Sequence, residues 1–153
     1  MYKPVKIIGV IGAGSADEQA LDNAYRVGAA IADSDAALVC GGMGGVMEAA
    51  CRGAKEAGGL TIGIVPGPDR LMVNRYVDVP IVTNMGHARN VIIAHTAQAL
   101  IAVAGGPGTL SEIAIGLKLG KPVISVNSWD VHDSIRRTDD PELAVKWALE
   151  AIG

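Results

Sequence analysis

The sequence is poor in aromatic residues and cysteines. Among its 153 residues there is no phenylalanine, there are two tryptophans and three tyrosines, and the two cysteines, Cys40 and Cys51, form no CxxC pair. Zinc ribbons and redox dithiols usually contain such a pair, so the spacing argues against both. A core without phenylalanine has to be built from Ala, Val, Ile and Leu. That composition suits helices packed on a parallel sheet better than a β-sandwich.

Long apolar runs and clusters of like charge are also absent. No stretch reaches the ~20 apolar residues that a membrane-spanning helix needs. The apolar run after Lys6 is broken by glycines and lacks the cleavage site of a signal peptide. The chain has 13 basic and 16 acidic residues, and its net charge is −3. We therefore expect a cytoplasmic protein that binds neither membranes nor, by electrostatic attraction, nucleic acid.

Apolar residues and glycine are abundant. Half of the residues are hydrophobic and only 19% are charged, which excludes a disordered chain. The length fits one domain spanning residues 1–153. Glycine accounts for 20 residues, about twice its usual frequency. This composition indicates a folded domain in which backbone segments approach one another closely.

Short apolar runs alternate with segments of helical periodicity. Such alternation with short connections implies right-handed βαβ crossovers, so we predict a doubly wound, mostly parallel, Rossmann-like sheet in three α/β/α layers. The predicted strands are 5–11, 37–40, 60–65, 79–83, 100–103 and 122–126, and the predicted helices are 15–33, 46–57, 88–97, 110–119 and 142–152. The polar segment 127–140 is predicted to be irregular.

Three glycine-rich loops, 12–14, 41–45 and 104–108, follow predicted strands. Ligands of such sheets bind beyond the carboxyl ends of the strands. Glycine lets backbone N–H groups approach a phosphate, and the next helix points its unpaired N–H groups at the same place. We therefore predict a phosphate-binding site. Its residues would be Gly12, Ser15, Gly42, Gly44, Gly45, Arg89, Gly105, Gly106, Gly108 and Thr109.

Two common nucleotide motifs are missing from these loops. No Gly-Lys-Ser/Thr follows them, which disfavours an ATPase, and residues 9–14 lack the GxGxxG spacing of a dinucleotide site. The glycines could also serve tight packing alone. In that case the chain would be a scaffold without a ligand.

Two charged residues stand beside the loops. Arg89 begins a predicted helix, where it could hold an anion with two hydrogen bonds or be an ordinary solvated arginine. Thr109 and Glu112 have the spacing of a capping box. Glu112 could therefore cap its helix, or place a carboxylate where it aligns a ribose hydroxyl or a water. His87 and His95 have no partners at ligand spacing, so no metal site is predicted.

Three segments resemble the motifs of one superfamily. Residues 41–48 resemble the GGxxGxM loop of the LOG-like (lysine-decarboxylase-like) Rossmann families, residues 86–90 are similar to their MHxRK segment, and residues 104–112 to their PGGxGTxxE signature. Order and spacing agree over about residues 5–126. The resemblance implies homodimers or tetramers that bind nucleotide-like phosphates.

Two branches of this superfamily imply different functions. The phosphoribohydrolases release a base, such as a cytokinin, from a nucleoside 5′-monophosphate, and Arg89 and Glu112 match their catalytic pair. The molybdenum-cofactor carrier proteins bind a pterin monophosphate and protect it without turnover. This sequence departs from the hydrolase pattern with Ala104 in place of proline and Asn90 in place of lysine. Glu48 and the compact length are also similar to the carriers.

We therefore predict a phosphate-anchored binding protein similar to the carriers, with no required cofactor and with the molybdenum cofactor or a nucleoside monophosphate as its ligand. A nucleoside 5′-monophosphate phosphoribohydrolase is the alternative. A lysine decarboxylase is not expected, because no lysine stands in a pyridoxal-phosphate context. Specificity for a pterin or a base would depend on the loops 66–78 and 127–140, where Trp129 would be a stacking lid or a core anchor. The apolar helix 110–119 suggests a homodimer.

Overall fold

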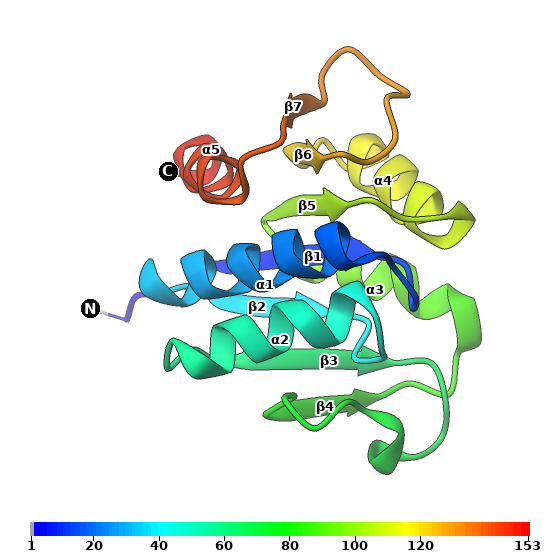
Figure 1. The fold of residues 1–153 in the computed structure, drawn as a ribbon. Helices are drawn as coiled ribbons and strands as arrows, with labels where there is room; N and C mark the ends of the chain where they lie inside the picture. Colours follow the sequence, from blue (N-terminus) through cyan, green and yellow to red (C-terminus); the bar gives the residue numbers. More distant parts are fainter. Residues whose placement is uncertain (1) are drawn as a thin grey trace.

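The computed structural model describes residues 2–153, and it has the predicted three-layer α/β/α architecture (Figure 1). The strands are β1 (Ile7–Gly12), β2 (Ala37–Cys40), β3 (Thr61–Val65), β4 (Val79–Val82), β5 (Ala99–Val103), β6 (Val123–Val126) and β7 (Arg136–Thr138). The helices are α1 (Glu18–Asp33), α2 (Val46–Glu56), α3 (Arg89–Thr96), α4 (Pro107–Lys118) and α5 (Pro141–Ile152), with short 3-10 helices η1 (Arg70–Met72) and η2 (Gly86–Ala88). Within residues 2–153 no helix has the length and apolar character needed to cross a membrane.

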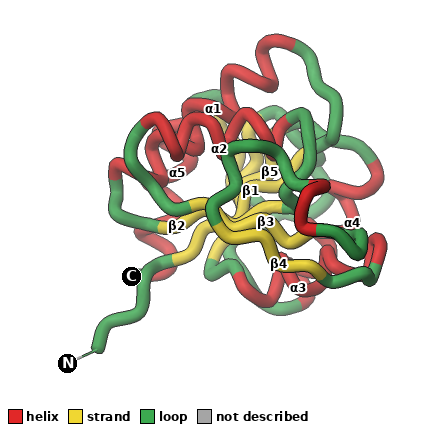
Figure 2. The backbone as a smooth tube through the Cα atoms, turned by 90° about the horizontal axis from the view of Figure 1, so that it is seen from below, coloured by secondary structure: helices red, strands yellow, loops and turns green. Residues whose placement is uncertain are grey.

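The seven strands form one sheet in the order β4-β3-β2-β1-β5-β6-β7, and every neighbouring pair is parallel. Helices α1, α2 and α5 cover one face and α3 and α4 the other, so the sheet lies between two helical layers (Figure 2). The strand order reverses between β1 and β5. Ligands of doubly wound sheets bind beside this switch point, at the carboxyl edge of the sheet.

The central strands are buried on both faces. All residues of β2 and β5 are buried, because helices cover the sheet from both sides. Along β1, Ile8 and Val10 pack under α1, α2 and α5, whereas Ile11 packs in the opposite core with α3 and α4. The continuous β-branched run in the sequence therefore supplies both cores from one strand.

Helices α1 and α2 touch through their backbones. A Cβ atom on Gly28 would lie 1.9 Å from the carbonyl oxygen of Ala50, and one on Gly53 would lie 2.0 Å from that of Tyr25. No other residue fits either position without separating the helices. Part of the glycine excess therefore serves helix packing and has no connection with a ligand.

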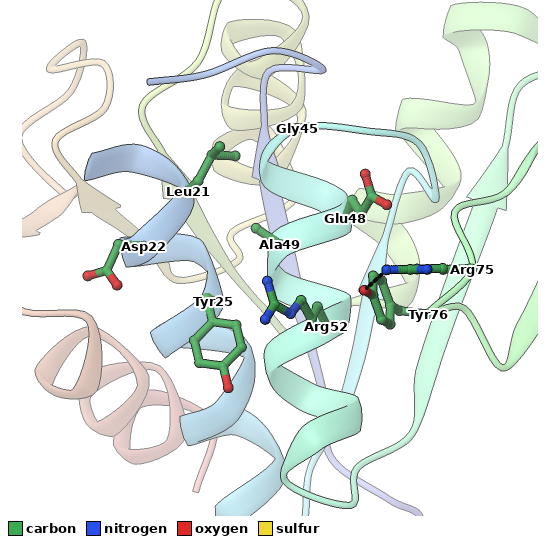
Figure 3. Close-up of a pocket in the computed structure, with 9 residues that line it drawn as sticks. All are labelled: Leu21, Asp22, Tyr25, Gly45, Glu48, Ala49, Arg52, Arg75 and Tyr76. Carbon is green, nitrogen blue, oxygen red and sulfur yellow. Dashed lines mark hydrogen bonds between the residues drawn. The ribbon is translucent and has the colours of Figure 1, made fainter. Parts of the chain in front are cut away.

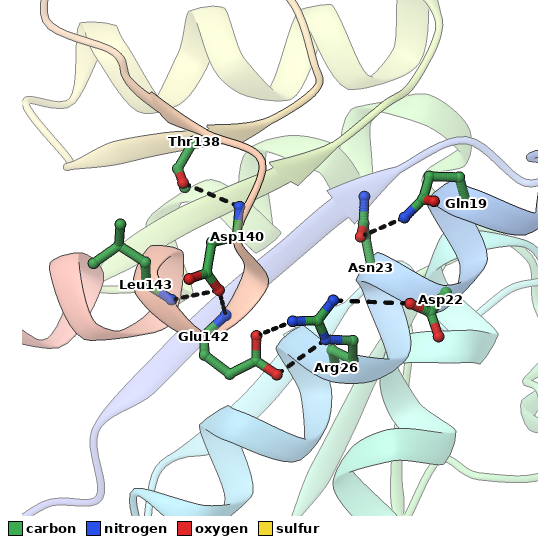
Figure 4. A network of polar contacts seen from close by, with 8 residues as sticks. All are labelled: Gln19, Asp22, Asn23, Arg26, Thr138, Asp140, Glu142 and Leu143. Atoms are coloured by element: carbon green, nitrogen blue, oxygen red, sulfur yellow. Dashed lines mark hydrogen bonds and ion pairs between the residues drawn. The ribbon is translucent and has the colours of Figure 1, made fainter.

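Helix α5 is attached to α1 by a pair of charged side chains (Figure 4). Arg26 donates from Nε and Nη2 to the two carboxylate oxygens of Glu142, at 3.0 and 2.6 Å. These hydrogen bonds hold the pKa of Glu142 below its ordinary value. Asp140 caps α5 by accepting from the backbone N–H groups of Glu142 and Leu143. The last helix is thereby fixed beside the first.

The structure corrects two predictions about local structure. The segment 127–140 is not wholly irregular, because Arg136–Thr138 forms β7 and pairs with β6. Three polar residues at a sheet edge carry no apolar pattern that a sequence could reveal. Helix α4 begins at Pro107, three residues before the predicted start, with Gly106 as its N-cap. The prediction of a capping box with Thr109 as N-cap is therefore wrong, because Thr109 already lies inside the first turn of the helix.

Candidate functional site

The glycine loops converge at the carboxyl edge of the sheet, as predicted. The backbone N–H of Val46 donates to the carbonyl oxygen of Ala13 at 3.0 Å, which joins the loop after β2 to the loop after β1. A Cβ on Gly45 would lie 2.4 Å from that same oxygen. A Cβ on Gly12 would lie 2.5 Å from the side chain of Val46 and 2.7 Å from the carbonyl oxygen of Val103. Gly12 therefore allows close packing under the site.

The loop after β2 has a fixed conformation. Gly42 and Gly45 have φ of +75° and +62°, which favour glycine. Asn74 fixes this loop with two hydrogen bonds. Its backbone N–H donates to the carbonyl oxygen of Gly42 at 2.8 Å, and its side-chain amide donates to that of Met43 at 2.9 Å. The N–H of Gly42 itself donates to the sulfur of Cys40 at 3.3 Å. Gly42 therefore shapes the loop, and its N–H is already used.

The start of α4 offers a row of free donors, which we name the α4 cradle. Ala104 and Gly105 have φ of +48° and +109°, so the chain turns sharply before the helix, and the N-cap Gly106 has no side chain to cap it. Within residues 2–153 the backbone N–H groups of the cradle donate no hydrogen bond. The helix dipole adds partial positive charge at the same place. The α4 cradle consists of the N–H groups of Gly105, Gly106, Gly108 and Thr109.

The space in front of the α4 cradle is open. A Cβ on Gly106 or on Gly108 would meet no protein atom within 4 Å. A hollow of about 400 Å³, which we name the edge hollow, adjoins it. Its lining residues are Ala104, Gly105, Asn127, Ser128, Trp129 and Asp130.

Trp129 forms one wall of the edge hollow. Its indole N–H donates to the carbonyl oxygen of Gly106 at 3.1 Å, and 36% of the residue is exposed. Ser128 donates from Oγ to the carbonyl oxygen of Ala104 at 2.5 Å. The loop after β6 is therefore tied to the loop before α4. Of the two roles predicted for Trp129, its place at the rim excludes that of a core anchor.

Thr109 and Glu112 lie beneath the α4 cradle. Thr109 is 2% exposed, and its Oγ1 has no hydrogen-bond partner among the described residues. It packs under Gly105, whose Cβ would lie 2.4 Å from that oxygen. Glu112 is 7% exposed. Burial raises the pKa of its carboxyl to about 8, although the positive charge of Arg89 acts in the opposite direction. At neutral pH this carboxyl is therefore mostly protonated.

Arg89 is half-buried and is not the solvated surface arginine that the sequence also allowed. Its guanidinium lies against Gly41 at the end of β2, with Nη2 2.8 Å from the position of a Cβ there. Nη1 donates to the side chain of Asn90, whereas Nε is buried without a partner in the described chain. Burial lowers the pKa of Arg89, and the nearby Glu112 and Cys40 oppose that shift. The structure therefore places Arg89 and Glu112 close together.

Asn90 connects the two helices below the site. Its side-chain amide donates to Ser111 at 3.3 Å, and Ser111 donates to the carbonyl oxygen of Gly108 at 2.7 Å. The position at which the hydrolase pattern has lysine therefore supports the α4 cradle from beneath. Ser15, predicted as a further contact, is exposed, and the cap of α1 is its neighbour Asp17.

Sequence reasoning missed the supporting roles of Asn74, Ser128 and Ser111. Asn74 is 31 residues from the loop that it holds, and Ser128 is 24 residues from Ala104. No local pattern reports such contacts. The only signal was that both lie in polar loops following strands.

Two kinds of similar protein among those known bear on function. The molybdenum cofactor binding protein of the phototrophic bacterium Rippkaea orientalis is 38% identical, with a TM-score of 0.94 over 99% of this chain and 100% of that one. The molybdenum cofactor carrier protein of Chlamydomonas reinhardtii is 38% identical, with a TM-score of 0.87 over 96% of this chain and 99% of that one. The cytokinin riboside 5′-monophosphate phosphoribohydrolase of Mycobacterium tuberculosis is 34% identical over 132 residues, 76% of this chain and 67% of the relative.

These relatives represent both branches that the sequence motifs suggested, and the resemblance is confirmed. The model of the SLOG cluster4 family matches residues 5–150, which is nearly the whole chain. The chain belongs to the SLOG cluster4 family.

Proposed function

We propose that the protein binds a pterin monophosphate of the molybdenum-cofactor type by its phosphate and protects it without turnover. The observation that carries the proposal is the α4 cradle, whose four N–H groups donate no hydrogen bond within the described chain. At two of its residues, Gly106 and Gly108, an added Cβ would meet no protein atom within 4 Å. A phosphate has acceptor oxygens for all of them and a charge that the helix dipole favours. The cradle thus fits the terminal phosphate of such a ligand.

Two features favour binding over hydrolysis. Stabilising a cationic sugar needs an ionised carboxylate, whereas the carboxyl of Glu112, with a pKa of about 8, is mostly protonated at neutral pH. Ala104 has φ of +48°, and proline, which stands here in the hydrolase pattern, is locked near −65°. The turn before α4 therefore has a shape that the hydrolase motif does not permit.

The similar structures support the same choice. The two molybdenum-cofactor proteins align over nearly the full length of both chains, whereas the phosphoribohydrolase aligns over about two thirds of its own length. The molybdenum cofactor would be cargo. Its phosphate would lie on the α4 cradle, and Arg89, whose Nε lacks a partner in the described chain, supplies the nearby positive charge.

One observation favours phosphoribohydrolase activity as the second candidate. Arg89 and Glu112 lie close enough to shift each other's pKa, and they match the catalytic pair of that branch. Under this alternative, Arg89 would hold the sugar-phosphate, and the ionised fraction of Glu112 would align the attacking water.

The test is calorimetric titration of the purified protein with neopterin monophosphate and with neopterin. The phosphorylated compound should bind at least about tenfold more tightly, and Gly106→Ala should remove that difference, because the added methyl group stands in the open space before the cradle. Gly106 has a φ of −114°, which alanine adopts without strain. Ala114→Ser, at an exposed position of the same helix, is the control and should bind as wild type. Equal affinities for the two compounds would contradict the proposal.

A further inference from the structure

A larger hollow lies on the outer surface of α1 and α2 (Figure 3). Its volume of about 600 Å³ is in the range of small-molecule sites. We name it the outer hollow. Three segments line it: α1 contributes Tyr25 and Asp22, whose carboxylate is paired with Arg26, α2 contributes Glu48 and Arg52, and the loop between β3 and β4 contributes Arg75 and Tyr76. Gly45, the last residue of the loop after β2, also lines the outer hollow. The hollow therefore adjoins the glycine loops without being part of the α4 cradle.

The walls of the outer hollow carry two pairs of planar side chains. The guanidinium carbon of Arg52 lies 5.5 Å from the centre of the Tyr25 ring, and that of Arg75 lies 5.0 Å from the centre of the Tyr76 ring. Arg75 also donates to the Tyr76 hydroxyl at 2.7 Å. Glu56 holds the other pair, since it accepts from both the Tyr25 hydroxyl and Arg52 Nε. Paired guanidinium and phenol planes are surfaces on which a flat heteroaromatic ring stacks.

Two charges in the outer hollow have no oppositely charged partner within residues 2–153. Glu48, in the first turn of α2, makes no side-chain hydrogen bond or ion pair there, and Arg75 has no acidic partner. The carboxylate of Glu56, by contrast, is occupied by Tyr25 and Arg52. A free carboxylate accepts two parallel N–H groups through its two oxygens. The hollow therefore offers planar side chains together with an acceptor for a pair of donors.

We propose that the outer hollow recognises the ring edge shared by pterins and guanine, on which a ring N–H and an exocyclic amino group stand side by side. Glu48 accepts both donors, and the ring lies between the Arg52–Tyr25 and Arg75–Tyr76 pairs. Adenine places a ring-nitrogen acceptor beside its amino group, so its lone pair faces the carboxylate and is repelled. This inference rests on the proposed function for its ligand, and it assigns ring specificity to Glu48.

The experiment is calorimetric titration with three unphosphorylated compounds: neopterin, guanosine and adenosine. Neopterin and guanosine should bind about tenfold or more tightly than adenosine, and Glu48→Gln should abolish that preference. Glu18→Gln is the matched control, because Glu18 is also in the first turn of a helix, α1, and lies outside the hollow. The tighter of the two favoured compounds identifies the ligand class. Equal binding of all three compounds, no binding, or an unchanged preference in Glu48→Gln would overturn the inference.

The same titrations separate this inference from the proposed function. In Gly106→Ala the unphosphorylated compounds should bind as in wild type, since that residue does not line the outer hollow. If neopterin monophosphate binds no more tightly than neopterin, phosphate binding by the α4 cradle is refuted, whereas ring recognition in the outer hollow is not. If Glu48→Gln leaves the ring preference intact while phosphate still adds affinity, the ring site fails and the cradle stands.

Discussion

Arg89 and Glu112 shift each other's pKa, yet no salt bridge joins them within the described chain. Burial acts on both groups more strongly than either charge acts on the other. It lowers the pKa of Arg89 and raises that of Glu112 to about 8. At neutral pH the guanidinium is charged and the carboxyl largely neutral. The net charge of the pair is therefore positive, which suits an anionic ligand.

Stability should fall as the pH rises, because of Glu112. An unfolded glutamate ionises near its ordinary pKa of 4.5, whereas in the folded protein Glu112 keeps its proton to about 8. Between those values the folded state binds more protons, so its contribution to the free energy of unfolding falls by at most about 1.4 kcal/mol per pH unit. Urea unfolding of wild type and Glu112→Gln across this range checks the sign. The variant should lose that slope, and identical slopes in the two proteins would refute the burial of an ionisable carboxyl.

Gly108→Ala should have opposite effects on the stability of α4 and on ligand affinity. Gly108 lies in the first turn of α4 with open space at its Cβ position, and alanine favours a helix over glycine by up to about 1 kcal/mol. The melting temperature should therefore rise slightly. Affinity for neopterin monophosphate should fall about tenfold, because the methyl group obstructs the α4 cradle. Affinity that rises with stability would show that this glycine does not face the ligand.

Gly12→Ala should destabilise the protein with or without a ligand. Its Cβ would lie 2.5 Å from Val46 and 2.7 Å from the carbonyl oxygen of Val103. Overpacking of this kind costs about 1–3 kcal/mol. Gly14→Ala, in the same loop with no atom within 4 Å of its Cβ position, is the control for chemical denaturation and should retain wild-type stability. Equal stabilities of the two variants would contradict the packing role.

The edge of the sheet at β4 should be where the protein associates with itself. Leu71 in η1 is 83% exposed, and Ile81 in β4 and Met85 beyond it are 42% and 49% exposed. Helix α4, expected from its sequence to supply such a surface, buries Ile113 fully and leaves Leu110, Ile115 and Leu117 partly exposed, less than the residues at the β4 edge. We predict a dimer in light scattering that Ile81→Lys converts to a monomer. Val131→Lys, at another exposed apolar position, should leave the mass unchanged. A monomeric wild type would contradict this prediction.

The sequence predicted the layers of the fold and the edge of the sheet at which the glycine loops meet, because both follow from local patterns. Apolar runs ending in glycine are visible in the chain, and parallel strands bring their carboxyl ends to one edge. The predicted start of α4 was wrong because Gly106 and Pro107 were assigned to the preceding loop. Proline is nevertheless favoured in the first turn of a helix.

The supports of the site could not be predicted, because they join distant parts of the chain. Trp129 reaches Gly106 across 23 residues, and Asn74 reaches Met43 across 31. The protonated state of Glu112 also depends on burial from several elements at once. The outer hollow could not be predicted from the sequence for the same reason, since α1, α2 and the loop after β3 each contribute only part of its lining.

The central claim is that the ligand is held and not cleaved. The most direct measurement incubates purified protein with neopterin monophosphate and with AMP, then separates bound and free compounds by chromatography. The account predicts that neopterin monophosphate is recovered intact from the protein and that no free adenine forms above background. Release of adenine and ribose 5-phosphate that disappears in both Arg89→Ala and Glu112→Gln, with folding intact, would contradict it and identify a phosphoribohydrolase.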